Sequence, residues 1–155
     1  MKIYFASDHE GFELKHELLN FVRGELNFAV EDCGDFTNDP GDDYPPLIAA
    51  AVEALRRDIE KGARSFAIIL GASGQGEAIV ANRFPHIRAA VFYGGSPEIL
   101  KLSREHNDAN VLSLGALFLA ADEAKKAVRL WLTTSFSGEE RHVRRIAQIE
   151  EVSEK

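Results

Sequence analysis

Cysteine is nearly absent from the sequence: Cys33 is the only one among 155 residues. A single thiol cannot form an internal disulfide. With no second cysteine there is neither a CxxC pair nor a Cys/His group with the spacing of a zinc site. We therefore expect no structural metal and no dithiol redox chemistry.

Long apolar runs and an excess of positive charge are also lacking. No apolar run approaches the roughly 20 residues of a membrane helix, and Met1-Lys2 leads into a strand-like run instead of a signal-peptide core. We expect a cytoplasmic protein with no membrane contact. The net charge of -7 argues against a nucleic-acid partner, which would need Lys and Arg over one face.

One short segment near the C-terminus departs from this acidic character. It contains Arg141, His142, Arg144 and Arg145 within five positions. That much positive charge is enough to bind one small anion, and a phosphate is the expected ligand.

The remaining composition is that of an ordinary globular domain. Hydrophobic residues make up 45% of the chain and charged residues 28%. A chain of this length buries roughly two thirds of the surface exposed by its unfolded form. We expect one domain over residues 1–155, since the sequence has no internal repeat and no linker.

Apolar runs suited to buried strands alternate with segments of helical periodicity, which indicates an α/β fold with a parallel sheet. The central run, Phe66 to Leu70, has no polar residue and should be covered on both faces. The five predicted strands are Ile3 to Ala6, Phe28 to Asp32, Phe66 to Leu70, Ile87 to Phe92 and Val111 to Leu114.

Helices are predicted between these strands from apolar residues at i, i+3, i+4 and i+7. They cover Gly11 to Glu25, Ile48 to Ile59, short segments starting near Ser73 and Ser96, Ala124 to Leu132, and Glu140 to about Ile149. The stretch Cys33 to Pro46 is rich in Gly, Pro and Asp and predicts a loop. The last helix, about 140–150, is polar on most faces, and we expect it to pack on a partner subunit.

In an open parallel sheet the ligand lies beyond the carboxyl ends of the strands. This rule selects Asp8 and His9 after the first strand, Asp43 and Tyr44 after the second, and Gly71 to Glu77 after the third. With them we group His106 and Asn107, at the end of the helix that precedes the fifth strand. Asp8 and His9 could equally be the N-cap pair of the first helix.

Gly71 to Glu77 form a loop of small residues that leaves a buried strand and opens a helix. Its N–H groups, with the helix dipole behind them, can stabilise an oxyanion or a phosphate. The alternative is a plain turn with Ser73 as N-cap. The spacing GxxGxG after the third strand differs from the dinucleotide motif GxGxxG after the first, which argues against NAD.

Two residues are candidates for proton transfer. Glu77 lies four residues after Ser73, whereas a capping box would place the acid three after, and a carboxylate beside an oxyanion pocket suits proton abstraction alpha to a carbonyl. The alternative is an acid favoured only by the helix dipole. His106, followed by Asn107, is a candidate acid or base for a ring oxygen, although a helix C-terminus also favours a cationic His.

Several motifs together resemble one family. They are Ser7 to Phe12, Asp43-Tyr44-Pro45, Gly71 to Glu77 with Ala81-Asn82, Arg104 to Gly115, and Arg141-His142 with Arg145. In this order, over about residues 3–149, they resemble the type B ribose-5-phosphate isomerase and galactose-6-phosphate isomerase family.

The resemblance implies a Rossmann-like three-layer α/β/α sandwich that needs no metal or other cofactor. It also implies a homodimer, or a tetramer of two such dimers, with each active site built from both subunits. Asp8 and His9 would contact the sugar, Tyr44 would line the pocket, and the backbone of Ser73, Gly74, Gln75 and Gly76 would hold the enediolate oxygen. His106 would open the furanose ring with help from Asn107. Arg141, His142 and Arg145 would bind the phosphate.

Within the family, one subgroup has Cys at the position of Gly71, and the other has Glu at the position of Glu77. This sequence resembles the second. It departs from the family at Leu117, where Arg is usual, at Ala72, where Gly is frequent, and at Glu139-Glu140, where Gly-Gly is usual.

The expected activity is the interconversion of ribose 5-phosphate and ribulose 5-phosphate through a cis-enediolate, with Glu77 as base. Alternatives are an isomerase of a hexose 6-phosphate of the galactose or allose type and a sugar-phosphate-binding paralogue without catalysis. A flavodoxin-like signalling domain is a third, but it gives neither the basic segment nor the Gly71 to Glu77 loop a role.

Overall fold

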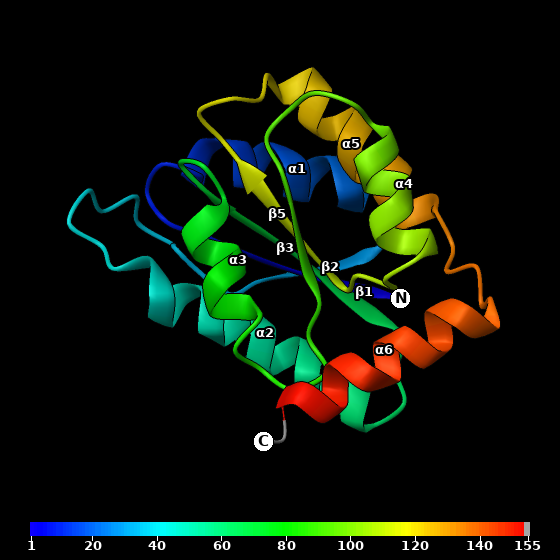
Figure 1. The fold of residues 1–155 in the computed structure, drawn as a ribbon. Coiled ribbons are helices and arrows are strands. Elements are labelled where there is room, and N and C mark those ends of the chain that lie inside the picture. The colour runs from blue at the N-terminus through cyan, green and yellow to red at the C-terminus, as the bar shows by residue number, and fades with distance from the viewer. Residues whose placement is uncertain (154–155) are drawn as a thin grey trace.

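A parallel sheet of five strands forms the centre of the computed structural model, which describes residues 1–153 (Figure 1). The strands lie in the order β2-β1-β3-β5-β4. Their bounds are β1 Lys2–Ser7, β2 Ala29–Asp32, β3 Ser65–Gly71, β4 Ala89–Phe92 and β5 Val111–Gly115. The predicted strands are confirmed, with ends that differ by one or two residues.

Helices cover both faces of this sheet, as expected for a three-layer sandwich (Figure 1). One layer holds α1, α4 and α5, and the other holds α2 and α3. The bounds are α1 Phe12–Gly24, α2 Tyr44–Glu60, α3 Gln75–Ala81, α4 Glu98–Glu105, α5 Ala121–Thr133 and α6 Glu140–Ser153.

The predicted loop Cys33 to Pro46 ends too late, because α2 already begins at Tyr44. Pro45 and Pro46 lie in the first turn of α2. A proline is tolerated there, since the N–H that it lacks would have no partner in the helix. Composition alone assigns these prolines to the loop, although prolines also mark a helix start.

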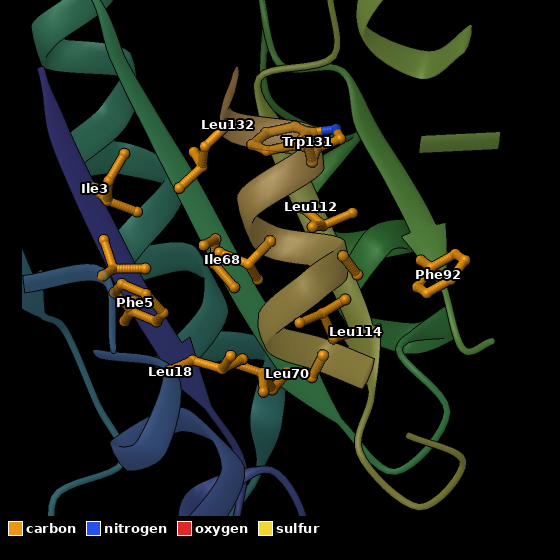
Figure 2. Close-up of a cluster of buried hydrophobic side chains, with 14 of the residues drawn as sticks. Ile3, Phe5, Leu18, Ile68, Leu70, Phe92, Leu112, Leu114, Trp131 and Leu132 are labelled. Atoms are coloured by element: carbon orange, nitrogen blue, oxygen red, sulfur yellow. The ribbon is translucent and has the colours of Figure 1, made fainter. Parts of the chain in front are cut away.

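Alternate residues of the strands face the two helical layers. In β3, Phe66, Ile68 and Leu70 pack toward α1 and α5, whereas Ala67 and Ile69 pack toward α2. Figure 2 shows Ile68 and Leu70 with Leu18 of α1 and Trp131 of α5 in the first of these two layers. Every residue of β3 is buried, as its unbroken apolar run predicts.

The chain changes direction between β1 and β3. After β1 it continues through α1 to β2 on one side, and after β3 it continues toward β4 and β5 on the other. At this switch point the Asp8 N–H donates to the Leu70 carbonyl at 3.3 Å. A Cβ on Gly11 would lie 2.7 Å from the Leu70 Cβ, so glycine is needed for α1 to start this close to β3. Such a switch point is where open α/β sheets bind ligands.

Helix α6 lies at the opposite edge, across the amino ends of the strands (Figure 1). Arg88, just before β4, pairs with Glu150 of α6 at 3.1 Å. A pocket of about 650 Å³ remains between α6 and this edge; its lining includes Ser65, Asn110 and Ile146. Most side chains of α6 are exposed. None of the helices within residues 1–153 is long and apolar enough to span a bilayer.

Candidate functional site

The loop after β3 is fixed by the chain that continues from β5. The Ala116 N–H donates to the Gly71 carbonyl at 2.8 Å, and the Leu117 N–H donates to the Ala72 carbonyl at 3.1 Å. The buried Ser113 hydroxyl donates to the Gly74 carbonyl at 2.6 Å. The loop therefore has one backbone path, held along its length by β5 and the residues after it.

Gly74 is the N-cap of α3 and has a φ of +76°, in the left-handed region that favours glycine. A Cβ at this position would lie 3.0 Å from the Leu114 carbonyl carbon. The expected helix near Ser73 thus begins at Gln75, and the alternative N-cap, Ser73, only accepts a long hydrogen bond from the Gln75 N–H at 3.4 Å. The N–H groups of the first helical turn have no preceding turn to donate to, so they are available to an anion.

The Glu77 side chain folds back from α3 over the end of β3. A Cβ on Gly71 would lie 2.0 Å from Glu77 Oε1 and 2.7 Å from Oε2. Glycine at position 71 therefore leaves the space that the carboxyl group occupies. Glu77 is only 4% exposed. Burial raises the pKa of this carboxyl, and the charge of Asp8 raises it further.

Asp8 and His9 follow β1, the strand next to β3 in the sheet. Asp8 Oδ1 accepts the Gly11 N–H at 3.0 Å, and burial raises the pKa of the Asp8 carboxyl. His9 Nδ1 lies 2.6 Å from Asp42 Oδ1. This hydrogen bond raises the pKa of His9, because the carboxylate stabilises the imidazolium.

Asp42 is not among the residues selected from the sequence. It lies in the loop between β2 and α2, which projects from the body of the molecule (Figure 1). Its position two residues before Tyr44 is the only available signal. That signal does not separate it from the other aspartates of the loop.

Tyr44 reaches the same edge from the first turn of α2. A Cβ on Gly76 would lie 2.8 Å from the Tyr44 hydroxyl oxygen and 2.9 Å from Cζ. The ring therefore packs against the backbone of α3 at its start. Tyr44 thus lies beside the start of α3, next to the loop after β3.

The other predicted site residues lie at the amino edge of the sheet. Grouping His106 and Asn107 with the carboxyl edge is wrong, because a helix that precedes a strand ends near that strand's amino end. His106 caps the C-terminus of α4, and its ring stacks on that of His142, with centroids 4.2 Å apart and planes at 12°. Burial lowers the pKa of His142, and the charges of His106 and Arg141 lower it further. Arg141 Nε lies 2.9 Å from Glu139 Oε2, and Arg145 is exposed on the same helix.

The fold of one chain does not bring the two groups together. A strand rises about 3.3 Å per residue, so the seven residues of β3 hold the two edges roughly 20 Å apart. We call the group at the carboxyl edge the base cluster: Asp8, His9, Asp42, Tyr44, Ser73, Gly74, Gln75, Gly76 and Glu77. We call the group at the amino edge the cationic cluster: His106, Asn107, Arg141, His142 and Arg145.

The arrangement of ligating side chains bears on metal binding. Among residues 1–153 no three His, Cys, Asp or Glu side chains are grouped so that they could hold a metal ion. The chemistry available at the carboxyl edge is that of a buried carboxylate, a His-Asp pair and main-chain N–H groups.

The whole chain resembles proteins of known family. Residues 3–149 match the family model described as Ribose/Galactose Isomerase. The chain is 38% identical over 146 residues to ribose-5-phosphate isomerase B of Mycolicibacterium paratuberculosis, covering 94% of this chain and 87% of the relative. It is 34% identical over 155 residues to ribose-5-phosphate isomerase B of Escherichia coli, covering 99% and 97%.

Solved structures show the same likeness. The ribose-5-phosphate isomerase B of Clostridium thermocellum superposes with a TM-score of 0.89 at 36% identity, covering 99% of this chain and 98% of that one. That of Mycoplasma genitalium, with bound ribulose-5-phosphate, superposes with a TM-score of 0.89 at 30% identity, covering 99% and 97%.

Proposed function

Because the chain belongs to the ribose/galactose isomerase family, we propose that it interconverts ribose 5-phosphate and ribulose 5-phosphate through a cis-enediolate. The single observation that carries the chemistry is the position of Glu77. Its carboxyl group lies over Gly71, buried, at the start of the helix whose N–H groups face the same space. A base and an oxyanion site side by side are what removal of a proton next to a carbonyl requires.

In the forward direction the open-chain aldose binds with its carbonyl oxygen near the N–H groups of Ser73 to Gly76. Glu77 takes the proton from C2, and the negative charge moves to the oxygen on C1. The resulting enediolate is held by the main-chain dipoles of the loop. A proton then moves from the C2 hydroxyl to the C1 oxygen, which leaves the negative charge on the C2 oxygen. Glu77 returns its proton to C1, the oxygen on C2 becomes the carbonyl, and the ketose leaves.

The burial of Glu77 serves this role. A carboxylate in water is a weak base, and a pKa raised toward the working pH increases the driving force for proton transfer. Activity should rise as the pH passes upward through the pKa of Glu77, because only the ionised carboxyl can take the proton.

We further propose that the enzyme is a homodimer in which the partner supplies the cationic cluster to each base cluster. The separation of the two clusters within one chain supports this. His106 and Asn107 of the partner subunit would act in ring opening, and Arg141, His142 and Arg145 would bind the phosphate. Exposed Tyr93, Ile99 and Phe118, each more than half exposed, supply apolar surface for an interface.

Loss of the base is the direct test of the reaction. Glu77→Gln keeps the size of the side chain and removes its basicity, so we expect kcat to fall by about 10²- to 10⁴-fold with little change in KM. Exchange of the C2 hydrogen of ribose 5-phosphate with deuterated water, followed by NMR, should be lost to the same extent. Full turnover by this variant would remove Glu77 from the mechanism.

Mixing two inactive variants tests the shared site. In a heterodimer of Glu77→Gln and Arg145→Ala subunits, one site carries both changes and the other carries neither. Random pairing makes half of the dimers mixed, so about a quarter of wild-type activity should return after joint refolding. If each site belonged to one chain, the mixture would stay inactive.

A hexose 6-phosphate isomerase is the second candidate, and Leu117 favours it. This residue is 64% exposed next to the loop after β3, at a position where the family usually has Arg. A panel of pentose and hexose phosphates, assayed for ketose formation, separates the two activities. The cytoplasmic location expected from the sequence stays a prediction.

A further inference from the structure

We propose that Asp42 is a positioning residue that holds the His9 ring in one orientation and in its protonated form, so that His9 Nε2–H donates to the phosphate of the substrate. The proposal rests on the proposed isomerase function and adds to it a residue from the loop between β2 and α2. It begins from the 2.6 Å contact between His9 Nδ1 and Asp42 Oδ1.

The contact fixes which ring nitrogen carries hydrogen toward the loop. An ionised carboxylate only accepts hydrogen bonds, so Nδ1 must be the donor. The Asp42 side chain is 10% exposed and that of His9 29%, so the pair is largely shielded from water that would compete for the bond. Asp42 Oδ2 is buried with no hydrogen-bond partner among the described residues, which leaves its charge directed at His9.

Three carboxylates face the His9 ring, and all of them favour its charged form. Asp42 contributes most, through the hydrogen bond; Asp8 and Glu10 act through their charges. Glu10 Oε1 lies 3.7 Å from Nε2, beyond hydrogen-bond distance. Nε2–H is therefore the donor of this ring that remains for a ligand.

The order of charged groups along the edge indicates which part of the substrate His9 meets. In the strand order β2-β1-β3, His9 follows β1 and contacts Asp42 from the loop after β2, whereas the Glu77 carboxyl lies over the end of β3. With Glu77 at C2, His9 lies toward the far end of a pentose, where the phosphate is. In the base cluster, His9 is also the one side chain able to carry positive charge toward an anionic substrate.

Asp42→Asn is the test variant, and Asp39→Asn is its matched control. Both remove one negative charge from the same loop. Asp39 Oδ1 accepts the Gly41 N–H at 2.9 Å, and the amide introduced by Asp39→Asn keeps an oxygen for this hydrogen bond. Asp42→Glu, which can restore a carboxylate contact, serves as the conservative rescue.

The first readout is the titration of His9 in the free enzyme, followed by NMR at the ring Cε1–H and assigned by its loss in His9→Gln. In Asp42→Asn the His9 midpoint should move to lower pH, because a neutral amide stabilises the imidazolium less than a carboxylate does. In Asp39→Asn it should stay. An unchanged midpoint in Asp42→Asn overturns the proposal.

The second readout is the split between KM and kcat for ribose 5-phosphate. The measurement is made at a pH where His9 is charged in wild type and neutral in Asp42→Asn. The phosphate is anionic both before and during the reaction, so losing its charge-assisted hydrogen bond should weaken binding and raise KM about tenfold. We expect kcat within about twofold, and partial recovery in Asp42→Glu. A fall in kcat at constant KM, or an equal rise in KM in Asp39→Asn, overturns the proposal.

These readouts separate this proposal from the proposed function. If wild-type protein isomerised no ribose 5-phosphate, the function would fail. Competition of inorganic phosphate with the sugar phosphate that is the true substrate would then give the same comparison of variants. The shift of the His9 midpoint does not depend on any substrate.

Discussion

The two ends of the strands carry site residues in very different ways. At the carboxyl edge the base cluster is built on backbone: Gly71, Gly74 and Gly76 each leave space that a neighbouring group fills. At the amino edge the cationic cluster lies on the end of α4 and on α6, a helix that is mostly exposed above a pocket of about 650 Å³. The Glu77 carboxyl is fixed by the fold, whereas Arg141 and Arg145 are long side chains on a peripheral helix.

This difference matches the demands of the reaction. Proton transfer at a carbon needs placement to within about an ångström, which a loop hydrogen-bonded to β5 and the residues after it provides. A phosphate dianion is held by charge over a broader range of positions, so flexible Arg side chains suffice. Placing the cations on a peripheral helix also allows them to act across an interface.

Among changes that leave every proposed site side chain in place, the largest effect is expected from a single methyl group at the carboxyl edge. In Gly71→Ala the new Cβ would meet the Glu77 carboxyl group at 2.0 Å, so the side chain of the base must move. Because the displaced atoms are the end of a flexible side chain, the fold should survive. We expect kcat to fall about 10²-fold or more while the circular dichroism spectrum and Tm stay close to wild type.

Gly24→Ala is the control for this change. Gly24 ends α1, and a Cβ there would meet no atom within 4 Å, so activity and fold should both be unaffected. Wild-type kcat in Gly71→Ala would show that the position of Glu77 over Gly71 is not needed for turnover.

The fold was largely predictable because burial and periodicity agree along the chain. The unbroken run Phe66 to Leu70 has one physical solution in an α/β protein, a strand covered on both faces, and the structure has it there. In an open parallel sheet the ligand lies beyond the carboxyl ends of the strands, which all lie at one edge. This rule correctly placed Asp8, Tyr44 and Glu77 at the same edge.

The contacts that sequence reasoning missed depend on long-range geometry. Asp42 meets His9 only because a loop that begins after β2 folds back over the end of β1. The stacking of His106 on His142 likewise depends on where α6 crosses the amino edge. No periodicity encodes the path of a surface loop or the docking of a terminal helix, so neither contact could be read from spacing.

A second prediction measures how strongly the carboxyl edge buries its base. The native pKa of Glu77 lies above its unfolded value, so the folded state binds the proton more tightly. The stabilising contribution of this group is therefore complete at pH values below the unfolded pKa and is lost as the pH rises through the native pKa. Glu77→Gln never carries the buried charge and should be more stable than wild type at neutral pH.

Thermal unfolding from pH 4 to pH 8 checks this sign. The difference in Tm between Glu77→Gln and wild type should grow with pH and then level off. Each kcal/mol by which the free energy of unfolding of the variant exceeds that of wild type should raise Tm by about 2–4 °C. Glu151→Gln, at an exposed position on α6, removes the same charge and should give a small difference that does not follow this trend. A gain in Tm that does not depend on pH would show that burying the ionised Glu77 carboxylate does not destabilise the fold.

The smallest effect is expected at the cationic cluster, where Glu139 pairs with Arg141 at 2.9 Å. Both side chains are about half exposed, so the pair is weak. Glu139 would compete with the phosphate that we propose as a ligand of this guanidinium. In Glu139→Gln the arginine is released, and KM for ribose 5-phosphate should fall by between about 1.5-fold and fivefold with kcat unchanged. Inhibition by inorganic phosphate should become stronger by the same factor.

Glu140→Gln separates this local competition from a general change in charge. Glu140 is adjacent, exposed and equally charged, but the ion pair with Arg141 is made by Glu139. If only overall charge mattered, both variants would lower KM equally. If the ion pair matters, Glu139→Gln lowers KM more than Glu140→Gln does. The difference in KM between the two variants should shrink as salt is raised from about 0.05 M to about 0.5 M. The reason is that dissolved ions weaken the attraction between exposed charges, and the screening length falls below about 10 Å once salt exceeds about 0.1 M. An excess that persists in high salt would mean that Glu139 acts by shaping the backbone at the start of α6 and not by occupying Arg141.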